Sequence, residues 1–317
     1  MKKKIKSEEF MTDNQTMRPG ASAFITIVGR PNVGKSSILN RLVGKKIAIV
    51  SKKPQTTRNR IMGVVTKDNS QLVFIDTPGL TLPKNALGNF MVKSVEQSVL
   101  GVDACLLVVE AGRDASKADK DLMERFKQQN IPAMLVINKI DLLKDKTALM
   151  KQIDEYMGLF PFSAVIPVSA RDGSGIQALE KELLGVAGEE GFLFPEDTLT
   201  DQTERVIVSE IVREKLLRLL NQEIPHGIAV VTESMKERGQ ILDLEVTIYC
   251  ERANHKGIII GKSGSMLKKI GIAAREDIER FFECKVNLQL WVKVKEDWRQ
   301  RPETLQTLGF NQRDLMF

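Results

Sequence analysis

The sequence predicts two domains: an α/β domain with a mostly parallel sheet and helices on both faces, then a smaller α+β domain. Short apolar runs alternate with longer amphipathic segments up to about residue 184. Residues 186–203 lose this periodicity and gather Gly, Pro and acidic side chains, and from residue 204 the element order becomes α-β-β-α-α-β. Because strands that alternate with helices build parallel sheets covered on both faces, the first observation predicts the fold class. The change of pattern predicts the boundary between the domains.

The first domain is expected at residues 21–185, after a mobile, basic N-terminus at residues 1–20. Its first strand, Phe24–Val28, enters a Gly-rich turn, and a helix follows from Ser36. Lys67–Ser70 is typical of a hairpin turn between two strands. The other strands are expected at 61–66, 72–75, 105–109, 133–137 and 164–168, and the helices at 86–100, 116–129, 146–157 and 175–184.

The second domain is expected at residues 204–317, after a linker at residues 186–203. Apolar side chains recur at helical spacing over residues 204–221. Strands at 228–232 and 241–249, helices around Ile258 and at 264–282, an alternating strand at Lys285–Val294 and a C-terminal tail complete the domain.

Composition excludes several classes of function. The 317 residues carry 47 basic and 41 acidic side chains, a net charge of +6. The apolar runs are shorter than the ~18–20 residues of a membrane span, and no apolar stretch follows the basic N-terminus as in a secretory signal. Cys105, Cys250 and Cys284 are scattered, which favours a cytoplasmic location. With only two histidines, the chain has little material for a histidine-based active site.

A phosphate-binding loop is predicted directly after the first strand. Its sequence matches G-x-x-x-x-G-K-[ST] at every fixed position and reads Gly29-Arg30-Pro31-Asn32-Val33-Gly34-Lys35-Ser36. The glycines let backbone N–H groups converge on phosphates, and the following helix points its positive end at them. Lys35 is expected to reach the β- and γ-phosphates, and the Ser36 hydroxyl is expected to bind Mg²⁺.

Two further segments each follow a predicted strand and extend this site. Asp76-Thr77-Pro78-Gly79 is only a turn sequence by itself, but one strand after a phosphate loop its Asp is expected to hold Mg²⁺ through water and its Gly to present an N–H to the γ-phosphate. The second segment is Asn138-Lys139-Ile140-Asp141.

The second segment favours GTP over ATP. A carboxylate at Asp141 accepts hydrogen bonds from both N1–H and the 2-amino group of guanine, whereas adenine offers neither donor. Such a mismatch costs about 1–3 kcal/mol for each buried group left unpaired. Ser169-Ala170, after the next strand, is placed to offer a backbone N–H to guanine O6.

The order and spacing of these segments resemble the translation-factor-related GTPases over residues 24–184. The resemblance implies that Pro54-Gln55-Thr56-Thr57-Arg58 is the first switch, in which a threonine closes on Mg²⁺ in the GTP state. Thr57 is preferred because it directly precedes the arginine, and Thr56 is the alternative. Lys35, Thr57 and Gly79 are then the residues expected to act in hydrolysis, with GTP or GDP and Mg²⁺ bound.

One position departs from the Ras-like pattern. Ras-like enzymes place a water-orienting glutamine directly after the glycine that corresponds to Gly79. This chain has Leu80 at that position, which is also expected in the nucleotide site. Slow intrinsic hydrolysis is therefore expected. GTPases with an apolar residue here often use a potassium ion, held partly by an asparagine of the phosphate loop, and Asn32 stands at that position. The resemblance thus implies that K⁺ stimulates turnover.

The positive charge of the second domain is concentrated in one window. Residues 252–275 hold six basic side chains and no acidic one, around the sequence Gly257-Ile258-Ile259-Ile260-Gly261-Lys262-Ser263-Gly264. This window resembles the KH module, and the element order is that of its type II topology. The resemblance implies a Gly-x-x-Gly loop that clamps single-stranded RNA beside an apolar groove of isoleucines. The residues expected at RNA are Lys256, Ile260, Gly261, Lys262, Ser263, Gly264, Lys268 and Lys269.

The combination of both modules resembles the Era family of bacterial ribosome-assembly GTPases, as do Trp298-Arg299 and Leu305–Phe310 near the C-terminus. This resemblance covers the chain except residues 1–20. It implies binding to 16S (small-subunit) ribosomal RNA near its 3′ end, a role in maturation of the 30S subunit, a GTP state that favours RNA binding, and a monomeric protein.

Two other functions stay open from the sequence. The chain could be an RNA anchor whose nucleotide is only structural. It could also be a regulatory GTPase at an anionic membrane surface, using the lysines at positions 2, 3, 4 and 6. Glu8 and Glu9 follow these lysines at once, which favours a solubilising tail over peripheral membrane contact.

Overall fold

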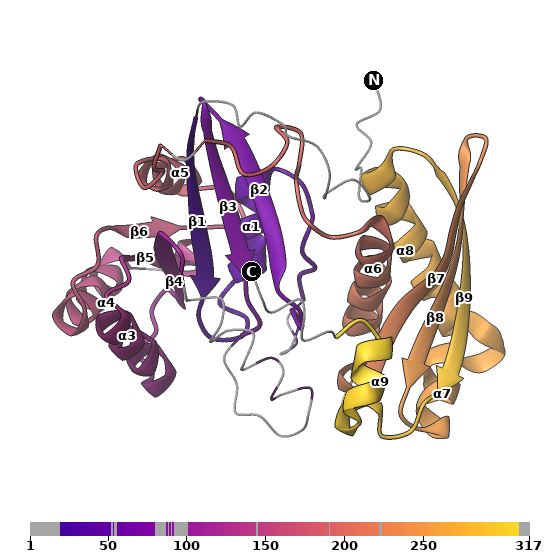
Figure 1. Cartoon of the computed structure of the whole chain (residues 1–317). Coiled ribbons are helices and arrows are strands. Elements are labelled where there is room, and N and C mark those ends of the chain that lie inside the picture. Colours follow the sequence, from indigo (N-terminus) through magenta and orange to yellow (C-terminus); the bar gives the residue numbers. More distant parts are fainter. Residues whose placement is uncertain are drawn as a thin grey trace. The chain divides into compact units, whose positions relative to one another are not determined.

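The computed structural model describes residues 20–310 except 52, 54, 55, 80–86, 88, 90, 92–100, 144, 190, 222 and 223 (Figure 1). The basic N-terminus, most of the helix expected at 86–100, the switch residues Pro54 and Gln55, Leu80 and the last residues of the tail lie outside the described residues. The described residues form two compact units. Of the described residues, those in 20–48, 57–79, 91 and 101–201 form the first unit. Those in 49–56, 87, 89 and 202–310 form the second unit.

The first unit is built on a six-stranded sheet with the order β2-β3-β1-β4-β5-β6. All neighbours pair in parallel except β2 and β3, whose antiparallel pairing comes from the predicted hairpin. Asp68 and Asn69 form its turn with positive φ angles of 50° and 60°, which these two residue types tolerate. The strands are β1 (Ala21–Val28), β2 (Ile61–Lys67), β3 (Ser70–Asp76), β4 (Ala104–Glu110), β5 (Ala133–Asn138) and β6 (Val165–Val168).

Helices cover both faces of this sheet, which confirms the predicted fold class. Alternate side chains of β4 enter two separate cores, so the strand is apolar up to its last residue, Glu110. Leu106 and Val108 pack toward α1 (Lys35–Val43) and α5 (Ile176–Leu184), whereas Leu107 packs toward α3 (Lys117–Gln129) and α4 (Lys146–Leu159). None of the described helices is both long and apolar enough to cross a lipid bilayer.

The segment predicted as a linker is attached to this sheet over most of its length. Gly188 forms a bridge with Ser22, and Thr200 forms one with Gly63. Gln71 is buried and satisfies the backbone between them: its amide donates to the Phe194 carbonyl at 2.9 Å, and its side-chain oxygen accepts from two backbone N–H groups. Residues up to 201 therefore belong to the first unit.

The second unit follows the predicted order α-β-β-α-α-β. Its sheet has the order β7-β8-β9, with an antiparallel and then a parallel pair. The first strand runs past the predicted end at residue 232, because pairing with β8 continues beyond a bulge after Thr232. The elements are α6 (Glu204–Leu219), β7 (Ile228–Arg238), β8 (Ile241–Cys250), α7 (Ala253–Ile260), α8 (Ser265–Phe282), β9 (Lys285–Val294) and α9 (Pro302–Thr307).

Trp298 anchors the C-terminal part of the second unit. Its side chain is fully buried, its indole N–H donates to the Gly227 carbonyl at 3.0 Å, and its ring stacks on Phe310 with 5.9 Å between ring centroids. A buried tryptophan with a satisfied N–H contributes both apolar burial and a specific orientation. The residues after β9 are thereby held against the loop that precedes β7.

The two tryptophans of the chain offer a matched test of this packing. Trp298→Ala is expected to lower the free energy of unfolding of the second unit by about 3–5 kcal/mol, because it leaves a large cavity. Trp291→Ala is expected to cost about 0.5 kcal/mol or less, since that side chain is 57% exposed. Urea denaturation followed by circular dichroism measures both, and equal losses for the two variants would contradict the assignment of Trp298 to the core.

Candidate nucleotide and nucleic-acid sites

The predicted phosphate loop connects the end of β1 to the start of α1, at the carboxyl edge of the sheet. β1 lies between β3 and β4, the position where ligands bind in open α/β sheets. The Lys35 ammonium is buried and donates to the carbonyls of Gly29 at 3.0 Å and Arg30 at 3.1 Å, so the loop wraps around it. Burial lowers the pKa of Lys35 to about 8, although the nearby Asp76 opposes the shift. A phosphate chain bound in the loop would be a negatively charged partner for Lys35 and would favour its charged form.

Ser36, Thr57 and Asp76 bring their oxygens together beside this loop. The Ser36 hydroxyl donates to Asp76 Oδ2 at 2.6 Å and lies 2.9 Å from Thr57 Oγ1, which is 3.5 Å from the same carboxylate oxygen. Thr56 points elsewhere: its hydroxyl donates to the Lys53 carbonyl at 2.6 Å. Of the two threonines left open by the sequence, the structure places Thr57 beside the predicted metal ligands.

The chemistry of this oxygen cluster fits a small hard cation. Asp76 is fully buried, and desolvation raises its pKa to about 6 while the charge of Lys35 opposes the shift. Its second oxygen, Oδ1, is buried with no hydrogen-bond partner among the described residues. The described residues contain no group of three His, Cys, Asp or Glu side chains placed to hold a metal ion. Mg²⁺ at nucleotides, however, takes few protein ligands and completes its shell with phosphate and water. The oxygens of Ser36, Thr57 and Asp76 fit this pattern.

Gly79 lies against the phosphate loop. A Cβ at this position would come within 2.7 Å of Pro31 Cα and 2.8 Å of its nitrogen, so only glycine fits. Thr77 fixes the approach, because its hydroxyl donates to the Ile27 carbonyl of β1 at 2.9 Å. The backbone of the second predicted segment is thus held against the phosphate loop.

The predicted base-recognition residues converge from two loops. The Asn138 amide donates to the Val33 carbonyl of the phosphate loop at 2.8 Å, and its oxygen accepts from the Ala170 N–H at 3.0 Å. The Ser169 hydroxyl donates to Asp141 Oδ1 at 2.8 Å. One asparagine therefore ties together the phosphate loop and the loop expected at guanine O6, and the carboxylate expected at N1 is oriented by a serine.

Several supporting residues were not predicted from the sequence. Glu110 ends β4 opposite Asn138 and pairs with Lys139 at 2.6 Å, and its position after an apolar strand was the available signal. Arg41, in the last turn of α1, donates to the Ala170 carbonyl at 2.8 Å. Asp119, a buried carboxylate in the capping box of α3, lies 3.3 Å from Arg30 of the predicted phosphate loop. These contacts join residues far apart in sequence, so no local pattern indicates them.

The Gly-x-x-Gly segment forms a tight turn between α7 and α8. Gly261, Ser263 and Gly264 have φ angles of 73°, 50° and 77°, and a Cβ at Gly261 would lie 2.8 Å from the Met266 nitrogen. The predicted lysines around the turn are exposed, namely Lys256, Lys262, Lys268 and Lys269. α8 has 18 residues and starts directly after the turn, so its positive end faces the same surface.

The expected apolar groove of isoleucines is only partly present. Ile259 is fully buried and belongs to the core, so it is not available to a ligand. Ile258 is 49% exposed, and Ile260 is half-buried. The reason is helical geometry: three consecutive residues of α7 point in different directions, and one of them must face the sheet.

Comparisons with known proteins agree with both sites. Residues 24–139 match the family described as 50S ribosome-binding GTPase, and residues 223–299 match the KH domain. GTPase Era of Ruminiclostridium cellulolyticum is 49% identical over 291 residues, covering 91% of this chain and 97% of that protein. GTPase Era of Clostridioides difficile is 47% identical over 92% of this chain and 98% of that protein.

Two solved structures are also similar over nearly the whole chain. One is Era in complex with MgGDPNP and nucleotides 1506–1542 of 16S ribosomal RNA, and the other is a single-residue variant of Aquifex aeolicus Era bound to GDP·AlF4⁻. Each has a TM-score of 0.88 and 39% identity, covering 92% of this chain and 99% of the other. Fold and site together define a P-loop GTPase that carries a KH domain. The chain belongs to the Era family of GTPases.

The base-recognition geometry leads to a test with one acidic residue against another. Asp141→Asn is expected to weaken GDP binding roughly 100-fold, because a carboxylate that accepts two hydrogen bonds is replaced by an amide that can keep only part of them. Asp145→Asn is the control, since Asp145 only caps α4 through the Thr147 N–H at 2.9 Å and asparagine caps equally well. Titration with a fluorescent GDP analogue measures both, and similar affinities for the two variants would contradict the assignment.

Proposed function

We propose that this GTPase binds the 3′ region of 16S ribosomal RNA through its KH domain and acts in the assembly and maturation of the 30S subunit. The main support is the exposed Gly-x-x-Gly turn at the start of α8, with four exposed lysines around it and no acidic residue between positions 252 and 275. The similar Era structure that holds MgGDPNP together with nucleotides 1506–1542 of that RNA supports the same assignment. The GTP-bound state is the one that favours RNA.

The geometry of the nucleotide site supports the following mechanism of hydrolysis. Lys35 and the N–H groups of the phosphate loop hold the β- and γ-phosphates, and Gly79 presents its N–H to the γ-phosphate. Ser36 and Thr57, with Asp76 acting through water, would hold Mg²⁺, which would neutralise phosphate charge when bound. Water then attacks the γ-phosphate in line, and GDP and phosphate leave. Positioning and charge stabilisation supply most of the catalysis.

The RNA proposal is tested by comparing two sets of three lysines. Lys262→Ala, Lys268→Ala and Lys269→Ala together are expected to weaken RNA binding more than tenfold. The same variant is expected to flatten the salt dependence of binding by a slope of about 2, at ~0.7 for each RNA phosphate that is no longer neutralised. The control replaces three exposed lysines of the first unit, Lys127, Lys151 and Lys181, and removes the same charge. Fluorescence anisotropy with RNA that ends in the small-subunit 3′ sequence measures both.

Hydrolysis without RNA is expected to be the same in both triple variants and the unchanged protein. If the control weakens RNA binding as much as the variant of the Gly-x-x-Gly region does, the binding is a general charge effect and the KH assignment fails.

We also propose that potassium assists hydrolysis through Asn32. Turnover is expected to be faster in KCl than in NaCl at equal concentration. Asn32 has a φ angle of 64°, so Asn32→Gly removes the side-chain oxygen while keeping a backbone conformation that glycine adopts readily. The variant is expected to hydrolyse GTP at equal rates in both salts. Equal rates in the unchanged protein would rule the proposal out.

A further inference from the structure

Three consecutive charged residues of α6 are almost completely buried in the second unit. Arg213, Glu214 and Lys215 are 3%, 0% and 6% exposed. Charged side chains are rarely buried to this degree unless they are paired, because desolvation disfavours their charged forms. The contacts of these three side chains therefore show which parts of the second unit they hold in place.

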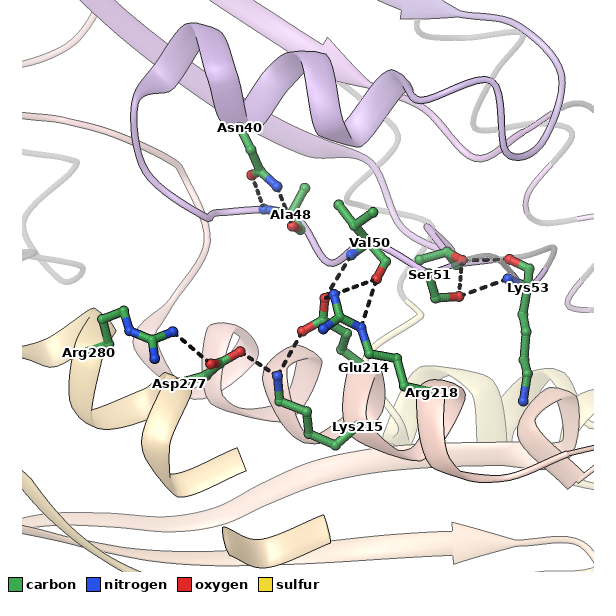
Figure 2. A network of polar contacts seen from close by, with 11 residues as sticks. Asn40, Ala48, Val50, Ser51, Lys53, Glu214, Lys215, Arg218, Asp277 and Arg280 are labelled. Atoms are coloured by element: carbon green, nitrogen blue, oxygen red, sulfur yellow. Dashed lines mark hydrogen bonds and ion pairs between the residues drawn. The ribbon is translucent and has the colours of Figure 1, made fainter. Parts of the chain in front are cut away.

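Two of them hold the chain segment that precedes Thr57. Residues 49–56 belong to the second unit, although the chain on either side belongs to the first. Glu214 accepts a hydrogen bond from the Val50 N–H at 3.2 Å and pairs with Arg218 at 2.7 Å, and Arg218 donates to the Val50 carbonyl at 3.1 Å (Figure 2). Arg213 donates to the Thr56 carbonyl. Both polar groups of Val50 and the carbonyl of Thr56 are thus bound to one helix.

The other end of this network reaches the helix that begins at the Gly-x-x-Gly turn. Lys215 lies 3.3 Å from Glu214 and also forms an ion pair with Asp277 of α8 (Figure 2). Asp277 forms a second ion pair, at 3.0 Å, with the exposed Arg280. A continuous network of ion pairs and hydrogen bonds therefore runs from Asp277 of α8 through Lys215 and Glu214 to the backbone of Val50.

The segment held in this way ends one peptide bond before the hydroxyl that fits Mg²⁺. Thr56 is bound by Arg213 and by its own contacts to Ser51 and Lys53. Thr57, the next residue, is 6% exposed and lies against Ser36 and Asp76. Because consecutive Cα atoms are a fixed ~3.8 Å apart, displacement of the Thr56 carbonyl also displaces Thr57.

We propose that Arg213 and Glu214 are positioning residues for Thr57, and that Lys215 with Asp277 transmits the occupancy of the Gly-x-x-Gly turn to it. The second half of this statement rests on the RNA binding proposed above, whereas the first half does not. The α6 network contacts both the segment before Thr57 and α8, so it couples nucleotide binding to RNA binding. Such coupling is reciprocal: if the GTP state favours RNA binding, RNA favours the GTP state by the same factor.

The first experiment uses no RNA. Arg213→Gln is expected to weaken binding of a non-hydrolysable GTP analogue with Mg²⁺ about tenfold, the effect of one hydrogen bond of ordinary net strength. GDP affinity is expected to stay within about twofold, because Thr57 reaches Mg²⁺ only in the GTP state. Arg205→Gln, an exposed arginine of the same helix, is the control and is expected to change neither affinity.

The ratio of the two affinities separates positioning from a structural defect. A variant that merely loosens the fold weakens both nucleotides, and this result, or no change in either, overturns the assignment. If Arg213→Gln does not fold, Glu210→Gln takes its place. Glu210 orients the Arg213 guanidinium through hydrogen bonds of 2.7 Å and 2.6 Å and is itself partly exposed, so a smaller change in the same direction is expected.

The second experiment measures the coupling. RNA affinity is compared in the presence of the GTP analogue and of GDP, and the unchanged protein is expected to bind RNA more tightly with the analogue. Lys215→Met is expected to bring this ratio close to 1, whereas Lys236→Met, an exposed lysine of the same unit, is expected to leave it unchanged. Asp277→Asn serves if Lys215→Met does not fold.

The outcomes distinguish the two proposals. If the unchanged protein shows no dependence of RNA binding on nucleotide, the proposed function and the transmission through Lys215 both fail, and the Arg213 experiment still decides the positioning of Thr57. If the dependence is present and Lys215→Met retains it fully, only the transmission through Lys215 and Asp277 is overturned.

Discussion

The nucleotide site depends on two opposite charges buried at the carboxyl edge of one sheet. Lys35 and Asp76 each lose solvation, and each partly compensates the other, as the opposing causes of their pKa shifts show. Asp76 is not fully satisfied by the described residues, because one of its buried oxygens has no hydrogen-bond partner among them. A phosphate and a divalent cation would complete this arrangement and would release binding energy at the place where the reaction occurs.

The rest of the first unit serves to keep those charges at a fixed spacing. The parallel register of β1 with β3 places the loop after one strand beside the end of the other, and Gly79 allows the two backbones to meet without a Cβ between them. Asn138 then extends the same rigidity to the base side, since it binds Val33 and Ala170 at once. One side chain therefore fixes the spacing between the two loops.

The second unit adds a different kind of constraint, in which buried charge holds a segment that is distant in sequence. Glu214 binds the Val50 N–H across 164 sequence positions, and Arg213 binds the Thr56 carbonyl across 157. Buried ion pairs contribute little net stability compared with apolar packing, but removing one partner is costly. Such a network therefore suits a segment whose position must be defined rather than merely stabilised.

Much of this protein is readable from local sequence. The phosphate loop, the strand-ending motifs and the Gly-x-x-Gly turn each occupy consecutive residues, and the alternation of apolar runs with amphipathic helices is a periodic signal that defines the fold class. The tertiary structure decided what depends on distant residues meeting. It placed Thr57, and not Thr56, beside Ser36, and it bound Phe194 of the predicted linker to Gln71 of the sheet. It also buried Ile259 in the core and paired Lys215 with Asp277. The physical reason is that burial and pairing of a polar group are set by its partners in space, whereas the shape of a turn or the face of a helix is set by its neighbours along the chain.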